Sequence, residues 1–221
     1  MKQSWTWRDL AQMGLFTVLV KPFVGLWMGL RVRGREHLPP TDPFILVANH
    51  SSHLDTLALL SLFPLARLRH VHPVAAADYF ERNKAIALLT RTACNILPIA
   101  RRNITADNDP IPRMVEALRA GQSLILFPEG TRGSGEDIGP FRSGIARVLE
   151  QVPRVPVVPA YLLNMGRSLP KGEYIPVPFF CEVRLGKPLQ LQGSHQEVTR
   201  ALESAVRALR SAPEHNASSA P

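Results

Sequence analysis

The chain has 221 residues, 45% of them hydrophobic and 20% charged, which is enough material for one substantial hydrophobic core. Its formal charge of +8 favours an anionic partner: a nucleic acid, an anionic membrane surface or a phosphorylated substrate. Only two cysteines occur, Cys94 and Cys181, so the sequence predicts neither a disulfide framework nor a zinc knuckle. We therefore expect one main globular domain in a reducing compartment.

The first element is an apolar stretch between Leu10 and Leu30, whose only charge is Lys21. At ~1.5 Å per helical residue it is long enough to span a bilayer. A lysine at mid-membrane is costly, however, and Pro22 removes a helix hydrogen bond. We therefore predict two short helices in an interfacial hairpin, within a membrane-associating helical segment of residues 1–38. A single transmembrane helix and a soluble core helix remain as alternatives.

The main domain is expected at residues 39–211, where apolar runs alternate with helical stretches. The predicted strands lie at residues 44–49, 70–77, 95–100, 123–127, 155–163 and 179–189. The predicted helices lie at residues 52–63, 79–92, 109–120, 143–151 and 194–211. This alternation predicts an α/β fold with a mostly parallel sheet flanked by helices. The polar residues 212–221 are expected to form a disordered tail.

The first unusual polar set, Asn-His-Ser-Ser-His-Leu-Asp at residues 49–55, follows the first predicted strand, and α/β sheets bind ligands at such strand ends. Ser52 and Asp55 have the spacing of a helix-capping pair, which leaves His50 unexplained. Asp55 at a helix start comes within reach of His50 and can hold one ring nitrogen, so that the other acts as a general base. A zinc site of His50, His53 and Asp55 is the alternative, although no fourth ligand is found.

The second unusual set is Phe-Pro-Glu-Gly-Thr-Arg-Gly-Ser-Gly-Glu, at residues 127–136. Its proline and glycines break regular structure right after a strand, so backbone N–H groups are left to face an anion beside Arg132. Glu129 is unexpected in such a loop. An ordinary surface turn is the alternative, but it gives no reason for Phe-Pro-Glu at the end of a buried strand. Arg101 and Arg102, after the third predicted strand, are either solvated helix-start charges or ligands of a phosphate. Arg142 is either a solvated helix-start charge or a contact for the phosphate or the donor's head group.

Together these residues resemble the glycerophospholipid acyltransferase family, and most closely its short bacterial lysophosphatidic acid acyltransferases. The resemblance covers roughly residues 35–188. The first to fourth family motifs correspond to residues 49–55, 95–101, 127–134 and 155–162. One position departs from the family pattern, because Asn95 stands where the second motif usually begins with glycine. This puts the local turn in question and leaves Arg101 in place.

The resemblance implies transfer of a fatty acyl group from a thioester to the free hydroxyl of lysophosphatidic acid, giving phosphatidic acid. It implies that His50 is the general base and that Asp55 orients it. The implied pocket for the acceptor's phosphate consists of Arg101, Glu129, Gly130, Thr131 and Arg132. No metal or resident cofactor is expected; acyl-coenzyme A or acyl-acyl carrier protein serves as co-substrate.

The expected partners are the lysophospholipid, the acyl thioester, a membrane surface and, as a candidate, acyl carrier protein. The expected location is the cytoplasmic face of the inner membrane, held peripherally or by a short anchor. Nucleic acid is not expected, because only 7% of residues are aromatic and several of these lie in the N-terminal apolar stretch. Two alternatives remain: another lysolipid acceptor, such as an amino-acid-containing lipid, and a non-catalytic membrane-associated binding protein.

Overall fold

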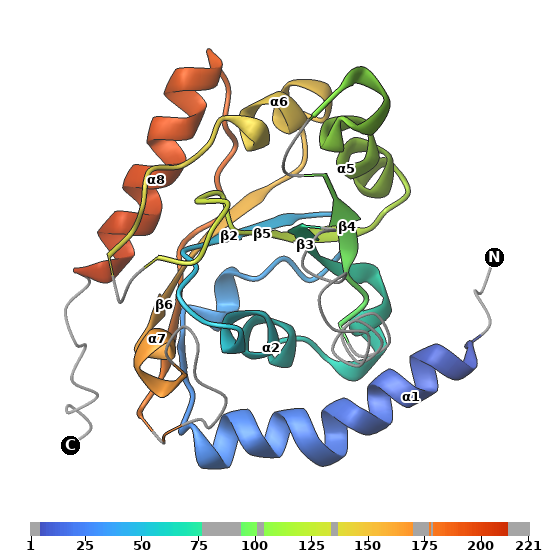
Figure 1. Ribbon diagram of the computed structural model, residues 1–221, viewed down its shortest axis with the longest axis vertical. Helices are drawn as coiled ribbons and strands as arrows, with labels where there is room; N and C mark the ends of the chain where they lie inside the picture. The colour runs from blue at the N-terminus through green and yellow to red at the C-terminus, as the bar shows by residue number, and fades with distance from the viewer. Residues whose placement is uncertain are drawn as a thin grey trace.

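The computed structural model describes residues 5–76, 94–100, 104–133, 137–169, 177 and 179–211 (Figure 1). Within these residues, one sheet contains seven strands in the order β1-β7-β6-β2-β5-β3-β4. The strands are β1 (Arg31–Arg33), β2 (Ile45–Ala48), β3 (Val71–Ala76), β4 (Leu97–Ile99), β5 (Ser123–Leu126), β6 (Val157–Leu163) and β7 (Glu182–Leu185). Every pairing is parallel except that of β6 with β7, so the prediction of a mostly parallel sheet is confirmed.

Helices cover both faces of this sheet (Figure 1). On one face lie α5 (Pro110–Arg119), α6 (Gly144–Gln151) and α8 (His195–Arg210); on the other lie α2 (Leu54–Ser61) and the N-terminal helix that begins with α1 (Trp7–Leu15). The short α7 (Met165–Ser168) follows β6. Three 3-10 turns occupy Arg35–His37, Leu65–His70 and Ala106–Asn108. The predicted helix at residues 79–92 and the predicted tail lie outside the described residues.

The central strands carry nearly continuous apolar sequence because both of their faces are covered. All four residues of β2 and all four of β5 are buried. Their side chains alternate between two hydrophobic clusters, so that Leu46 joins the cluster shared with α2 and Val47 joins the cluster shared with α8. The functional residues described below follow these two rigid strands directly.

The N-terminal apolar stretch forms one continuous helix, Trp7–Trp27, so the prediction of a hairpin is wrong. After α1 the helix passes through π-helical turns at Phe16–Val20 and Phe23–Trp27, with Pro22 in helical geometry at φ −61°. Such wider turns let a helix continue through a residue that cannot donate the usual bond. By length and composition this helix is able to cross a membrane, and it indicates membrane association.

The same helix is also packed on the domain. Phe16, Val20, Val24 and Met28 are buried in the cluster shared with α2, and their four-residue spacing places them along one side of the helix. Lys21, the charge that argued against a single helix, donates through Nζ to the carbonyl of Phe63, just past the end of α2, at 3.1 Å. A cation at this end complements the α2 dipole and its unpaired carbonyls.

Candidate active site

The site begins where β2 ends. Asn49, the residue after this strand, is buried, and its side chain both donates to the Leu162 carbonyl at 3.0 Å and accepts from the Leu162 N–H at 2.7 Å. These two bonds tie the end of β2 to β6. They fix the point at which the chain leaves the sheet, and His50 is the next residue.

Asp55 holds the histidine from the first turn of α2. Its Oδ2 accepts from His50 Nδ1 at 2.8 Å and from the backbone N–H groups of Ser51 and Ser52 at 2.7 and 2.8 Å. The carboxylate is fully buried. Because a carboxylate in this position only accepts, His50 Nδ1 carries the proton and Nε2 is left as the basic nitrogen. The structure therefore brings His50 and Asp55 together in the arrangement that a general base requires.

The ring of His50 is positioned by its stacking partner as well as by its hydrogen bond. It stacks on Phe127, the residue that follows β5, with ring centroids 4.2 Å apart and an interplanar angle of 21°. The His50 side chain remains 20% exposed, so its edge is accessible to a substrate hydroxyl. Position and access are thus both fixed by residues at two adjacent strand ends.

Glu129 connects the loop after β5 to the backbone of His50. Its Oε1 accepts from the His50 N–H at 2.9 Å, and its Oε2 accepts from the Gly139 N–H at 3.0 Å. Burial raises the pKa of this carboxyl, an effect that the two backbone hydrogen bonds oppose. Both oxygens of Glu129 are therefore already used inside the protein, on the side of the loop that faces the base.

Position 130 favours glycine for two reasons. Its φ of +74° lies in the left-handed region, and a Cβ at this position would lie 2.7 Å from Arg142 Nε. The exposed Arg142 side chain thus lies directly across the loop. Gly133 donates its N–H to the His50 carbonyl at 2.9 Å, so the loop binds both the N–H and the carbonyl of His50. Gly130 donates its N–H to the Phe127 carbonyl at 3.1 Å. For these two glycines the prediction of N–H groups that face an anion is wrong, because the turn itself uses them.

Arg132 lies close enough to His53 to affect its titration. Partial desolvation, and then the positive charges of Arg132 and His50, lower the pKa of His53 to about 4. The two charge effects indicate that Arg132 and His50 both lie near His53. Thr131 is exposed in the same loop. Arg101 lies outside the described residues.

Asn95, the departure from the family pattern, adopts a glycine-like conformation with φ of +51°. Asparagine tolerates this region better than other residues with a side chain. Its side-chain amide donates to the Arg69 carbonyl at 3.0 Å, and its backbone carbonyl lies 2.9 Å from His72 Nδ1. The turn at the start of the second motif is therefore formed without glycine.

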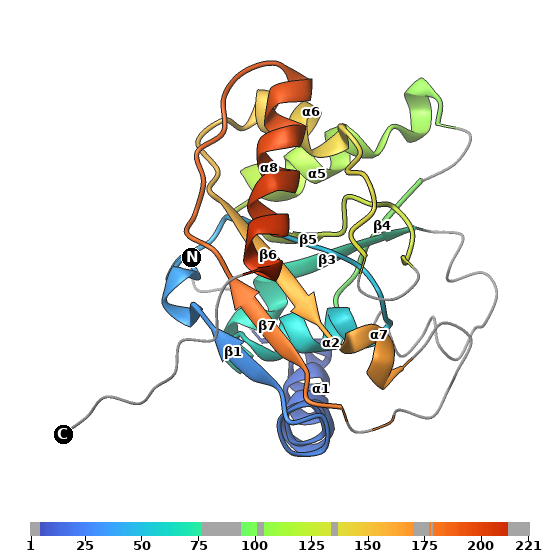
Figure 2. The ribbon, with the colours of Figure 1, turned by 90° about the vertical axis from the view of Figure 1, so that its left-hand side faces the viewer.

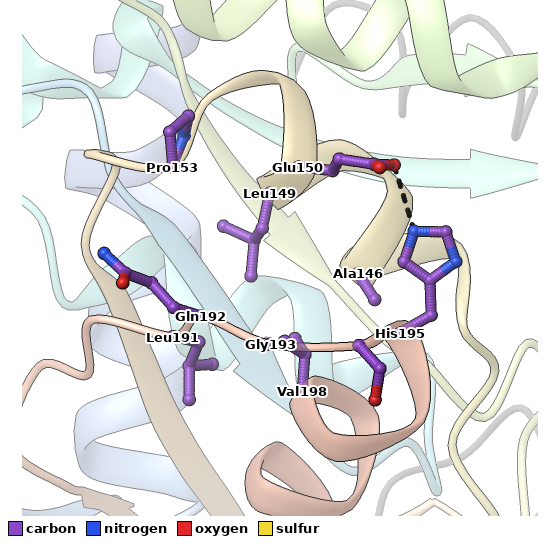
Figure 3. A pocket seen from close by; sticks show the side chains of 10 residues that line it. Ala146, Leu149, Glu150, Pro153, Leu191, Gln192, Gly193, His195 and Val198 are labelled. Atoms are coloured by element: carbon purple, nitrogen blue, oxygen red, sulfur yellow. Dashed lines mark hydrogen bonds and ion pairs between the residues drawn. The ribbon is translucent and has the colours of Figure 1, made fainter.

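Two further features of the described residues bear on ligand binding. No group of three or more His, Cys, Asp or Glu side chains there is arranged to hold a metal ion. A hollow of about 420 Å³ lies between α6 and the start of α8, with Glu150 and His195 paired at 3.0 Å across it (Figure 3). None of the residues that line this hollow belongs to the predicted site, so the two are separate.

The contacts that were not predicted from the sequence include the Asn49 side-chain bond to Leu162, the stacking of Phe127 on His50 and the Gly139 N–H bond to Glu129. Asn49 and Phe127 each lie at the first position after a buried strand, and this position is a signal that sequence reasoning can use. Gly139 lies ten residues from Glu129 in an irregular segment, and no sequence pattern marks it.

The fold and the site define a class: an α/β protein with a carboxylate-bound histidine at one strand end and a glycine-containing loop at the next. Residues 29–163 match the model of the Acyltransferase family, and this match covers more than half of the chain. The chain therefore belongs to that family. The prediction of an acyltransferase family is confirmed.

Related sequences and one solved structure agree with this assignment. The chain is 28% identical to 1-acyl-sn-glycerol-3-phosphate acyltransferase alpha of Mus musculus over 80% of this chain and 61% of that protein. It is 30% identical to the chloroplastic 1-acyl-sn-glycerol-3-phosphate acyltransferase BAT2 of Brassica napus, over 64% of this chain but 39% of that protein. The chain thus spans less than two thirds of these relatives.

The fold is shared with the crystal structure of the 1-acyl-sn-glycerophosphate (LPA) acyltransferase PlsC from Thermotoga maritima. The TM-score is 0.70, and the alignment covers 95% of this chain and 83% of that one. At 21% sequence identity, this match establishes the α/β architecture alone.

Proposed function

We propose that this protein transfers a fatty acyl group from an acyl thioester to the free hydroxyl of lysophosphatidic acid, giving phosphatidic acid. The observation that carries the proposal is the hydrogen bond from His50 to the buried Asp55, formed beside the loop at residues 127–133. The names of the relatives from Mus musculus and Brassica napus support lysophosphatidic acid as the acceptor.

In the proposed reaction, His50 Nε2 accepts the proton of the acceptor hydroxyl while the oxygen attacks the thioester carbonyl. The carbon–sulfur bond then breaks, and the thiolate leaves and takes up the proton from the imidazolium. Asp55 keeps the ring in the required tautomer and stabilises its charged form. General base catalysis of this kind contributes a factor of ~10²–10⁴ in rate. No covalent intermediate and no metal are needed.

The acceptor's phosphate is proposed to bind Arg132, Thr131 and Arg101, beside a turn that Gly130 shapes and closes through its N–H bond to the Phe127 carbonyl. A guanidinium offers two parallel N–H bonds to phosphate oxygens, and Arg142 lies across Gly130 as a further cation. Glu129 already accepts a backbone hydrogen bond on each of its two oxygens. We therefore assign Glu129 the task of positioning His50 at the edge of this pocket, rather than of contacting the phosphate.

Membrane contact is proposed to bring the protein to both lipid substrates, at the cytoplasmic face of the inner membrane. The net charge of +8 favours anionic head groups there. The acyl donor is acyl-coenzyme A or an acyl-acyl carrier protein, both of which present a thioester.

The test is an acyl-transfer assay of the purified full chain against lysophosphatidic acid, lysophosphatidylcholine and an amino-acid-containing lysolipid, each with both donor types. We expect transfer to lysophosphatidic acid at the highest kcat/KM. A higher kcat/KM with another lysolipid would support the same acyl transfer with that lysolipid as the acceptor. Absence of transfer to every acceptor, in a protein that still binds membranes, would favour the non-catalytic binding protein.

A further inference from the structure

The exposed apolar side chains of this protein are concentrated in two segments. Apart from Ile104, every large exposed hydrophobic side chain among the described residues lies within residues 5–27 or residues 177–180. The most exposed are Leu26 at 87%, Val18 at 79% and Phe180 at 75%. Contiguous exposed apolar surface of this kind marks a binding site for an apolar partner.

The two segments meet at one corner of the molecule. The start of β7 lies beside the end of the N-terminal helix in both views (Figures 1 and 2). The backbone joins them, because the Cys181 N–H donates to the Met28 carbonyl at 3.3 Å and the Arg31 N–H donates to the Cys181 carbonyl at 2.9 Å. A Cβ on Gly29 would lie 3.1 Å from the Phe180 ring, so glycine lets this ring lie against the helix end. We call Leu26, Trp27, Phe179 and Phe180 the aromatic corner.

The orientation of the helix decides how this surface meets a partner. Its inner side is buried against α2, and Lys21 is bonded to the Phe63 carbonyl. A helix that crossed a bilayer would lose those contacts and place Lys21 in hydrocarbon. Figure 2, which looks nearly along the helix axis, shows the helix lying along one side of the domain. Its outer side, with Val18 and Leu19, therefore faces outward along its length.

The side chains around this surface match a lipid bilayer. Trp5 and Trp7 lie at one end of the helix and Trp27 at the other, and tryptophan favours the membrane–water interface. Basic residues flank both ends: Arg8 lies 5.8 Å from the Trp7 ring centroid, and Arg31 lies 5.9 Å from the Phe180 ring centroid. Such cations attract anionic head groups at the depth where the tryptophans lie.

We propose that Val177, Phe179 and Phe180 join the outer side of the Trp7–Trp27 helix in one surface that binds a lipid bilayer. The helix lies flat in the interface, and the aromatic corner inserts most deeply. This inference extends the proposed function by naming a second membrane-binding segment and its orientation. It needs no catalysis by His50, so the two proposals fail independently.

The first test measures flotation of the full chain with vesicles of phosphatidylcholine and phosphatidylglycerol. We expect the double variant Phe179→Ser/Phe180→Ser to bind about tenfold more weakly or worse, since each phenylalanine loses a large apolar transfer free energy. Ile104→Ser is the matched control, because Ile104 is 52% exposed outside both segments, and it should bind normally. His50→Ala should also bind normally. Unchanged binding of the double variant would overturn the proposal.

The second test does not depend on the stability of the double variant. In a Trp5→Phe/Trp7→Phe/Trp27→Phe background, Phe180→Trp provides a single fluorophore at the aromatic corner. We expect lipids brominated near the head-group end of the acyl chain to quench it strongly on vesicle binding. Absence of quenching would exclude insertion of this segment. Resistance to alkaline extraction together with deep quenching at residue 18, probed by Val18→Trp, would instead show a helix that spans.

Discussion

The segments that follow β2 and β5 lie side by side, and they form the site in different ways. The segment at residues 49–55 uses side chains: the Asn49 amide ties down the strand end, and the Asp55 carboxylate binds the His50 ring. The segment at residues 127–133 uses its backbone: a left-handed Gly130 shapes the turn, and the Gly133 N–H binds the carbonyl of His50. We therefore expect the proposed chemistry to depend on side-chain identity in the first segment and on loop shape in the second.

The largest effect is expected in the side-chain segment. His50→Ala removes the proposed base and should lower kcat by ~10²–10⁴ in the acyl-transfer assay. His53→Ala is the matched control, three residues along the same segment, and should retain most of the activity. Comparable losses in both variants would mean that the two histidines act together, contrary to a single base.

A smaller effect is expected for the carboxylate that joins the two segments. Glu129→Gln presents an NH₂ group to one of the two backbone N–H groups that now donate to Glu129, so the backbone of His50 or of Gly139 must move. Misplacement of a catalytic group by about 1 Å costs up to ~10² in rate. We expect kcat to fall while KM for lysophosphatidic acid changes little.

Glu116→Gln, on the exposed side of α5, controls for the loss of one charge. If Glu129→Gln instead raises KM for lysophosphatidic acid with normal kcat, Glu129 contacts the acceptor's phosphate, contrary to the assignment made above.

Arg132→Ala tests the phosphate assignment in the backbone segment. Loss of a charge-assisted hydrogen bond to phosphate weakens binding by about 1.5–3 kcal/mol, so KM for lysophosphatidic acid should rise at least about tenfold. The kcat value should change much less. Arg119→Ala, on the exposed surface of α5, is the control for the loss of positive charge. An unchanged KM in Arg132→Ala would place the phosphate elsewhere.

The smallest effect is expected from Gly130→Ala, measured as thermal stability. Left-handed backbone at alanine costs about 1–2 kcal/mol, and the new methyl group also displaces Arg142. Gly121→Ala is a close control, because Gly121 has a similar φ of +77° and open space around it. Both variants should lose stability, and Gly130→Ala alone should also raise KM for lysophosphatidic acid. Equal effects in both variants would show that the Arg142 contact is unimportant.

Much of the fold was predictable because the buried strands are apolar runs that end at turn residues. The predicted strands at residues 44–49 and 123–127 contain β2 and β5, and the predicted helix at residues 194–211 contains α8. The edge strand β1 was missed, since Arg-Val-Arg gives little sign of a strand. It is stabilised by β7, about 150 residues away, and by the ion pair of Arg33 with Glu182.

The error at the N-terminus and the unpredicted contacts of the loop share a physical origin. Pro22 would break an isolated helix and Lys21 would be costly at mid-membrane, but Lys21 finds a partner just past the end of α2 and the helix widens around Pro22. The contacts of Glu129 likewise depend on His50, 79 residues away. Local patterns predicted His50 and Asp55 as a pair because both lie within one short segment. Partners that tertiary packing supplies leave no such pattern.

The two backbone bonds of His50 have a consequence for how substrate and base communicate. Its N–H and its carbonyl are both bound to the loop after β5, through Glu129 and Gly133. The peptide groups of the base therefore move with that loop as one body. We expect an acceptor that draws the loop inward to reorient the imidazole at the same time. Binding of the acceptor would then also set the orientation of the His50 ring. A hydrolytic side reaction, in which water replaces the acceptor, would lack this alignment.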